Sequence, residues 1–109
     1  DLVLKQIETK GDKTKDELTL DSSTWGNYKN TQNSLVQTGV SHQTSTLNIY
    51  DLAGNVWEWT LETSTNDSHL SVIRGGSYVD DGASFPVSCR YDNSYSDSNN
   101  TLGFRAVLY

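Results

Sequence analysis

The segment from residue 51 to residue 60, DLAGNVWEWT, constrains the fold of this chain more than any other. Small residues that favour a turn lead into a run in which Trp57, Trp59 and Leu61 recur at every second position. Side chains at this spacing share one face of a β-strand. The pattern predicts a tight turn followed by a buried strand, with Trp57, Trp59 and Leu61 facing the core and Glu58 fixed on the other face.

Other regular structure is predicted to be short. Aliphatic and β-branched residues predict strands at 2–8 (LVLKQIE), 70–78 (LSVIRGGSY) and 102–109 (LGFRAVLY). Helix signals are weak: segments 13–20 and 33–39 can each form one or two turns, but neither continues an apolar stripe over three turns. Strands and irregular structure should therefore dominate.

A long polar segment separates the opening residues from the central strand. Residues 21–45 are rich in Ser, Thr, Asn, Gly and Gln around Trp25 and Tyr28, a composition typical of a loop held in place by aromatic side chains. No internal repeat and no linker divides the chain. We expect a single domain that spans residues 1–109, because this length suits one hydrophobic core.

Composition excludes several classes of partner. Eight basic against 14 acidic residues give a net charge of −6, which disfavours nucleic acid because no basic cluster could release counterions from a phosphate backbone. Membrane insertion is not expected, since no apolar run approaches the roughly 20 residues needed. Cys89 is the single cysteine, which excludes an internal disulfide. Since the chain starts at Asp1 and lacks methionine, we expect a fragment or a processed product.

Three motifs stand in order along the second half of the chain: YDLAGNVWEWT, VIRGGSY and, after CRY, LGFRAVLY. Together they resemble the formylglycine-generating enzyme family, also called the sulfatase-modifying factor domain, over about residues 48–109. The segment TWGNY at 24–28 is a weaker extension. The resemblance implies an α+β, C-type lectin-like fold of mostly short strands, long loops and little helix. The residues expected to belong to its scaffold are Arg74, Gly75, Gly76, Gly103, Phe104 and Arg105.

The resemblance also identifies the positions that matter for catalysis. Oxidases of the family bind copper through two cysteines that follow RGGS, and they oxidise a substrate cysteine. This chain has Asp80 and Phe85 at about those positions, and copper(I) prefers thiolates. We therefore expect no copper and no enzyme activity, with Cys89 an inert core residue. His42 and His69 show no metal-binding spacing and are expected in loops.

The turn before the central strand commonly holds calcium in the family. A structural calcium ion here would be bound by the carboxylates of Asp51 and Glu58 and by the main-chain carbonyls of Gly54 and Val56. Such an oxygen-rich set suits a hard cation. The alternative is that Glu58 forms an ion pair with Arg74 or Arg105. The sequence leaves both open.

Residues 78–100, YVDDGASFPVSCRYDNSYSDSNN, have the composition of a binding surface. Tyrosine supplies contact area at low entropic cost, while Ser, Asn and Asp supply adaptable hydrogen bonds, as in antibody paratopes. The alternative is an ordinary polar loop. The residues predicted to contact a ligand are Tyr78, Asp80, Asp81, Ser84, Phe85, Tyr91, Asp92, Asn93, Tyr95 and Asp97.

The same stretch contains no Lys, Glu, Gln, Met or Trp. These are the residues that codons ending in C cannot encode, which favours a variable protein of a diversity-generating retroelement, a group that shares this fold. We expect a ligand-binding module for a protein or a cell-surface glycan, located outside a bacterial cell or on a phage particle, and able to oligomerise. The alternatives are an oxidase of the family and a glycan-binding lectin. The latter is disfavoured because the single proline, Pro86, lacks the flanking motif of such lectins.

Overall fold

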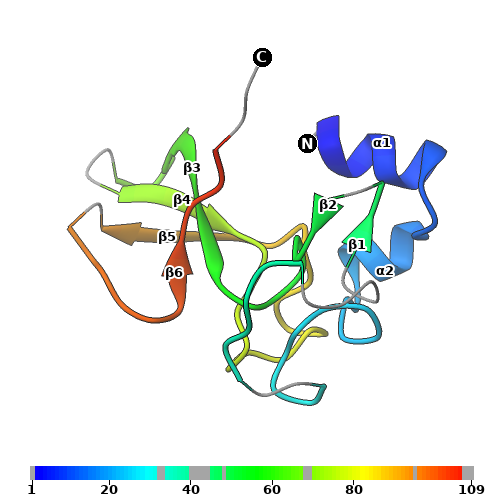
Figure 1. Cartoon of the computed structure of the whole chain (residues 1–109). Helices are drawn as coiled ribbons and strands as arrows, with labels where there is room; N and C mark the ends of the chain where they lie inside the picture. The colour runs from blue at the N-terminus through cyan, green and yellow to red at the C-terminus, as the bar shows by residue number, and fades with distance from the viewer. Residues whose placement is uncertain are drawn as a thin grey trace.

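The structure, a computed structural model, describes residues 2–31, 34–39, 45–47, 49–67, 70–94 and 96–106. Two helices lie on one side and a four-stranded sheet on the other, with a two-stranded sheet between them (Figure 1). The elements are α1 (Leu2–Lys10), α2 (Lys15–Thr19), β1 (Ser45–Thr46), β2 (Ile49–Tyr50), β3 (Trp57–Thr63), β4 (Leu70–Arg74), β5 (Arg90–Ser94) and β6 (Leu102–Gly103). The result is an α+β, C-type lectin-like fold of short strands and long loops. Neither described helix has the length and apolar character to cross a membrane.

The larger sheet has the strand order β5-β4-β3-β6. Strand β4 is antiparallel to both β3 and β5, and β6 runs parallel to β3. The register places Ile73 opposite Tyr91 and Trp57 opposite Leu102. Residues from three distant parts of the chain thereby meet at one end of the sheet. Strand β5 lies inside the polar stretch for which only loop was expected.

The prediction of a strand at residues 2–8 is wrong, because this segment forms α1. Leu4 and Ile7 are three residues apart, so a helix places them on one face. Ile7 is buried in the core, and Leu4 packs against that core. Val3 is exposed, so the β-branched residues that favoured a strand did not decide the outcome. Burial of one helical face explains why this segment forms a helix.

The expected helical turn at residues 13–20 is confirmed as α2, and a capping box explains where it begins. The Thr14 hydroxyl accepts a hydrogen bond from the Glu17 N–H at 3.2 Å, and the Glu17 carboxylate accepts one from the Thr14 N–H at 2.6 Å. These bonds satisfy two N–H groups at the helix start. Leu18 on the inner face joins Ile7 in the core.

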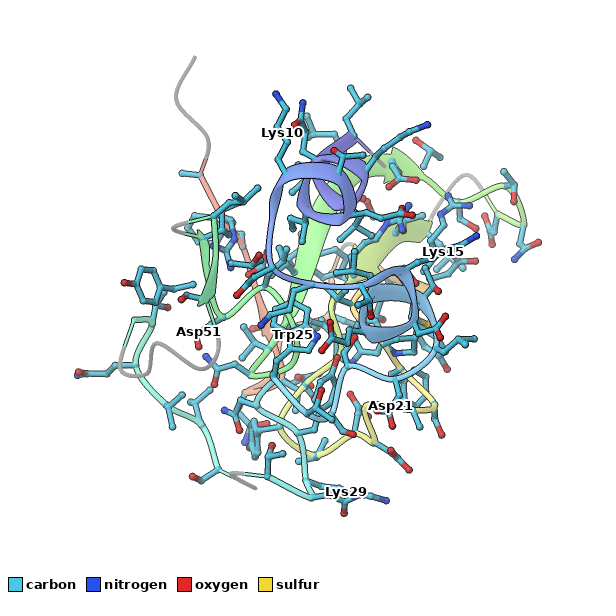
Figure 2. The ribbon with its side chains drawn as sticks, turned by 90° about the vertical axis from the view of Figure 1, so that its right-hand side faces the viewer. Lys10, Lys15, Asp21, Trp25, Lys29 and Asp51 are labelled. Atoms are coloured by element: carbon cyan, nitrogen blue, oxygen red, sulfur yellow. The ribbon has the colours of Figure 1, made fainter. Side chains whose placement is uncertain are left out.

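The main core lies between the helices and the loops, and its buried members are Ile7, Leu18, Trp25, Tyr28, Ala53 and Val87. Trp25 lies near the middle of the view in Figure 2, below α1. Its indole N–H donates to the carbonyl of Glu17 at 3.1 Å. The prediction that Trp25 and Tyr28 hold a long loop in place is confirmed for the described residues of 21–45.

The shared buried face predicted for the central strand is only partly correct. Trp57 is 7 % exposed, but Trp59 is half-buried and Leu61 is fully exposed. Two features account for the difference. Strand β6 pairs only with Trp57 and Glu58, and the pairing of β3 with β4 shifts register between Trp59 and Thr63. The second half of β3 therefore extends beyond the packed part of the sheet.

The closing strand is also shorter than predicted. Strand β6 ends at Gly103, and Phe104 is 82 % exposed. Phe104 is therefore not part of the packed scaffold, because its ring covers no core. Residues 107–109, in the remainder of the predicted strand, lie outside the described residues, as do His42 and His69.

Candidate ligand-binding site

The loop between β4 and β5 forms one wall of the candidate site, and the N-terminal half of the chain holds it in place. The Tyr28 hydroxyl lies 3.1 Å from the carbonyl oxygen of Gly75 and 2.9 Å from that of Phe85, and it donates to this pair. Burial raises the pKa of Tyr28 well above its ordinary value. Elsewhere in the loop, the carbonyls of Asp80 and Gly82 accept main-chain hydrogen bonds from the segment around Tyr28. These particular bonds to the loop backbone do not involve the loop's own side chains.

Asp80 is the charged residue at the centre of this wall. Its Oδ2 atom accepts hydrogen bonds from the Trp57 indole N–H at 2.8 Å, the Ser77 N–H at 2.9 Å and the Ser77 hydroxyl at 2.7 Å. Three donors on one oxygen fix the orientation of the carboxylate. They also connect the β4–β5 loop to the start of β3.

Three aromatic rings meet beside Asp80. The ring centroids of Trp57 and Phe85 are 5.5 Å apart, those of Trp57 and Tyr91 are 5.8 Å apart, and those of Phe85 and Tyr91 are 6.2 Å apart. They border a hollow of about 220 Å³, which we call the aromatic hollow. Its lining residues are Trp57, Ile73, Asp80, Phe85, Tyr91, Asn93, Thr101 and Leu102.

A second hollow lies on the other side of Tyr91. It has a volume of about 460 Å³, is lined by Thr65, Asn66, Arg90, Tyr91 and Asp92, and is called the polar hollow below. Asp92 accepts hydrogen bonds from the Ser64 hydroxyl at 2.7 Å and from the Asn66 side-chain amide at 3.0 Å. Tyr91, 55 % exposed, forms the boundary between the two hollows.

The structure groups half of the residues predicted to contact a ligand. Asp80, Phe85, Tyr91 and Asn93 line the aromatic hollow, and Asp92 lines the polar hollow. The other described residues of that set line neither hollow: Tyr78, Asp81, Ser84 and Asp97. Asp81 caps its own loop by accepting from the Ala83 N–H at 3.0 Å. Tyr95 lies outside the described residues.

Several lining residues were not predicted. Trp57 was expected only as a core residue, and no local signal marked Thr101 or Leu102. The parallel pairing of β6 with β3 brings them together, and the Trp57 N–H donates to the Thr101 carbonyl at 2.7 Å. Thr65, Asn66 and Arg90 were also missed. A contact across more than 40 residues leaves no trace in local sequence patterns.

Glu58, the second residue of β3, pairs with Arg105, which is the alternative to calcium that the sequence left open. The Arg105 guanidinium donates to both Glu58 oxygens, with the shortest distance 2.6 Å from Nη2 to Oε1. Hydrogen bonding to Glu58 raises the pKa of Arg105 above its ordinary value. Arg74 does not pair with Glu58; it contacts Glu62 at 3.1 Å.

The proposed calcium ligands Asp51, Val56 and Glu58 line one small hollow of about 200 Å³, together with Arg105. Gly54 lies in the same turn, but it is not among the lining residues. Both Glu58 oxygens already accept from a guanidinium, so a calcium ion would have to share or displace that cation. The contacts fit the ion pair better than the metal. Calcium stays a prediction to be tested by experiment.

Arg105→Gln should lower the free energy of unfolding by about 1–3 kcal/mol, because it leaves the half-buried Glu58 carboxylate without its cation. Arg90→Gln is the matched control: Arg90 pairs with Glu62 at a more exposed site, where the expected loss is about 1 kcal/mol or less. Urea unfolding in a chelator measures both losses. Equal losses would contradict the assignment. Restoring calcium tests the metal, since a bound ion should raise the melting temperature of the unmodified chain.

Comparison with known proteins places this arrangement in a family. A sequence model of the sulfatase-modifying factor enzyme 1-like domain matches residues 7–109. The chain belongs to this family. Its curated relatives include inactive C-alpha-formylglycine-generating enzyme 2 of Bos taurus, 40 % identical over 65 residues that make up 54 % of this chain and 22 % of the relative. The Mus musculus protein of that name matches at 40 % identity over 65 residues, with 54 % and 21 % coverage.

A solved structure has the same fold. Treponema denticola variable protein 1 superimposes with a TM-score of 0.62 at 23 % sequence identity, over 86 % of this chain and 38 % of the other. The sulfatase-modifying factor-like domain described here thus spans about a fifth of the length of the curated relatives it matches. It spans somewhat more than a third of the variable protein.

Within this sulfatase-modifying factor-like domain, the positions expected to correspond to the copper-binding cysteines both line the aromatic hollow. They carry the Asp80 carboxylate and the Phe85 ring, a donor set that does not fit copper(I). Cys89 is half-buried, is not among the lining residues and contacts the Arg90 carbonyl at 3.7 Å. Burial raises the pKa of the Cys89 thiol, which keeps it protonated and unreactive near neutral pH.

Proposed function

We propose that this domain is a non-catalytic ligand-binding module, in which the aromatic and polar hollows and the surrounding residues 78–100 contact the ligand. The observation that carries the proposal is the cluster of Trp57, Phe85 and Tyr91 around a fixed Asp80 carboxylate. Exposed tyrosine beside oriented polar groups is the composition of protein and glycan binding sites. The hollow lies where the family's oxidases are expected to bind copper, but it offers a carboxylate and a phenyl ring instead.

Main-chain bonds that do not depend on exposed side chains support a surface that tolerates substitution. Main-chain and scaffold bonds hold the β4–β5 loop, as at the Asp80 and Gly82 carbonyls. Strand β5 is held by pairing with β4 across five residues, from Arg90 to Ser94. Side chains such as that of Tyr91 can therefore change without loss of these bonds. This arrangement is what a retroelement-diversified protein requires, and we propose that identity for the chain.

The proposed ligand is a protein or a glycan on a cell surface, which places the domain outside the cell or on a phage particle. Tyr91 lines both hollows, so the two are adjacent. Small hollows beside an exposed ring suit a projecting group on a larger partner more than an enclosed small molecule. The inactive enzyme named among the relatives supports a role without catalysis.

Tyr91→Ala should weaken binding to cell surfaces at least tenfold and leave the melting temperature almost unchanged, because Tyr91 is half-exposed and borders both hollows. Flow cytometry with the labelled domain on a panel of bacterial and host cells measures this. Phe104→Ala is the matched control, since it removes an exposed ring that lines neither hollow. Equal losses in the two variants, or unchanged binding in Tyr91→Ala, would exclude this surface as the site. Oxygen uptake with copper and a thiol peptide would reveal catalysis and refute the proposal.

Sequencing the gene from independent isolates tests the retroelement identity separately. We expect substitutions confined to codons ending in C within residues 78–100, beside a reverse-transcriptase gene and a near-copy of the repeat. Positions such as Tyr28 and Gly54 should not vary, because they hold the scaffold. Invariant codons without that genetic neighbourhood would mean a fixed ligand surface.

A further inference from the structure

We infer that the aromatic hollow binds a quaternary ammonium group of the choline type. This inference rests on the proposed function, because it names the chemistry of the group that enters the hollow. Aromatic faces attract organic cations through their negative quadrupole, and a nearby carboxylate adds a direct electrostatic attraction. The hollow combines both, and its lining residues otherwise carry no charge.

The three rings contact one another and form one aromatic wall of the hollow. Their centroids lie 5.5–6.2 Å apart, and Phe85 stands nearly perpendicular to both other rings, at 79° to Trp57 and 82° to Tyr91. A compact head group can pack against this wall beside Asp80. The volume of about 220 Å³ lies below the roughly 300–1,000 Å³ of pockets that enclose a drug-sized molecule. A head group fits better than a whole ligand.

Asp80 supplies an unpaired negative charge. Its Oδ2 atom holds three donors, whereas Oδ1 accepts no hydrogen bond within the described part of the chain. Among the described residues, no Lys or Arg forms an ion pair with Asp80, and none lines the hollow. The three donors stabilise the carboxylate through one oxygen, and a cationic ligand can pair with the other.

The second half of the chain contains few cations, although the Lys29 N–H bonds to the Asp80 carbonyl. All five lysines precede residue 30, and the view onto the helix side shows Lys10 and Lys15 on the two helices (Figure 2). Residues 30–109 carry three arginines against eight carboxylates. Each arginine pairs with a glutamate: Arg74 and Arg90 with Glu62, and Arg105 with Glu58. The field around the hollow therefore attracts cations.

The apolar part of the lining favours a methylated cation over a bare ammonium group, while Asn93 and Thr101 add polar side chains to the hollow. Ile73 and Leu102 complete the wall beside the rings and supply no hydrogen-bond acceptor from their side chains. A lysine ammonium is strongly hydrated and needs several acceptors to replace its water. Methyl groups around a quaternary nitrogen spread the charge and need none. Neutral sugars could also stack on Tyr91, but they would leave Asp80 unpaired.

Titration by NMR tests the inference with choline and with 3,3-dimethylbutan-1-ol, a neutral molecule of nearly the same shape. The Trp57 indole N–H is the reporter, because it donates to Asp80 beside the hollow. We expect saturable shifts with choline and at least tenfold weaker binding of the alcohol. Phosphocholine, titrated separately, distinguishes a phosphate-linked head group from free choline as the source.

Asp80→Asn should lower the ratio of choline affinity to alcohol affinity at least tenfold. The substitution keeps an acceptor for the Trp57 N–H but removes the charge. Asp16→Asn makes the same chemical change on α2 and should leave binding unchanged. No saturable shift with choline, or equal binding of choline and the alcohol, overturns the inference. A neutral ligand whose affinity falls in Tyr91→Ala but stays the same in Asp80→Asn overturns the choline inference and leaves the proposed function intact. Absence of any Tyr91-dependent cell binding overturns the proposed function itself.

Discussion

Gly54→Ala should lower the free energy of unfolding by about 3 kcal/mol or more, enough to unfold much of a domain of ordinary stability. Gly54 has a φ of 74°, in the left-handed region that costs other residues about 1–2 kcal/mol. An added Cβ would also overlap the main-chain oxygen of Asn27, far inside van der Waals contact. Urea unfolding or the loss of near-ultraviolet circular dichroism measures the effect.

Gly39→Ala separates the two causes. Gly39 has a similar φ of 84°, but within the described residues no atom beyond its chain neighbours lies within 4 Å of a Cβ at this position. Only backbone strain remains, partly offset by the lower entropy of the unfolded chain, so we expect a loss of about 1 kcal/mol. Equal losses in the two variants would show that strain alone makes Gly54 necessary. A loss below 1 kcal/mol in Gly54→Ala would contradict the packing described here.

The contact between Gly54 and Asn27 shows why the central motif predicts the fold so well. Gly54 donates to the Gly75 carbonyl at 2.7 Å, and Asn27 and Asn55 bond to each other's main chain and side chains across the same point. The turn of GNVWEW, the end of RGGS and the loop around Tyr28 therefore meet in one place. A motif with such close backbone contacts cannot change without loss of the fold, so a short sequence carries much of the architecture.

Sequence patterns failed where distant pairing overrides local preference. Strand β5, with the sequence RYDNS, contains residues that are rare in strands, yet five of its residues pair with β4. The opening segment contains β-branched residues but forms α1, because a helix buries Leu4 and Ile7 together. In both segments the rest of the molecule selects the structure.

Residues of the candidate site were predictable where they lie close to the motifs in the sequence. Asp80 and Phe85 follow RGGS closely, so the resemblance located them. Trp57 was singled out for packing, and its part in the hollow depends on β5 and β6. Those two strands bring Tyr91 and Leu102 to it from more than 30 residues away. The sequence left open whether Glu58 binds calcium or pairs with an arginine. Only the three-dimensional contacts could show that the arginine is Arg105 and not Arg74.

Tyr28→Ala should lower the free energy of unfolding by about 3–5 kcal/mol, the range for removal of a large buried side chain. The Tyr28 side chain is fully buried among the helices, the glycine turn and the β4–β5 loop. Its loss leaves a cavity, and it leaves the Phe85 carbonyl without its donor, whereas the Gly75 carbonyl keeps the Gly54 N–H. Thermal and urea unfolding measure the loss. Tyr91→Ala is the control, because it removes the same side chain from an exposed position.

Tyr28→Phe isolates the hydroxyl group. It keeps the ring and should cost about 1–3 kcal/mol, since it leaves the Phe85 carbonyl without a donor while the Gly75 carbonyl keeps the Gly54 N–H. The ring of Phe85 borders the aromatic hollow. Tyr28→Phe should therefore also weaken ligand binding, although Tyr28 is not among the residues that line the hollow. A variant that binds as tightly as the unmodified chain, at a temperature where both are folded, would show that the Phe85 position does not depend on this bond. A joint loss would mean that the core residue Tyr28 sets the geometry of the binding surface.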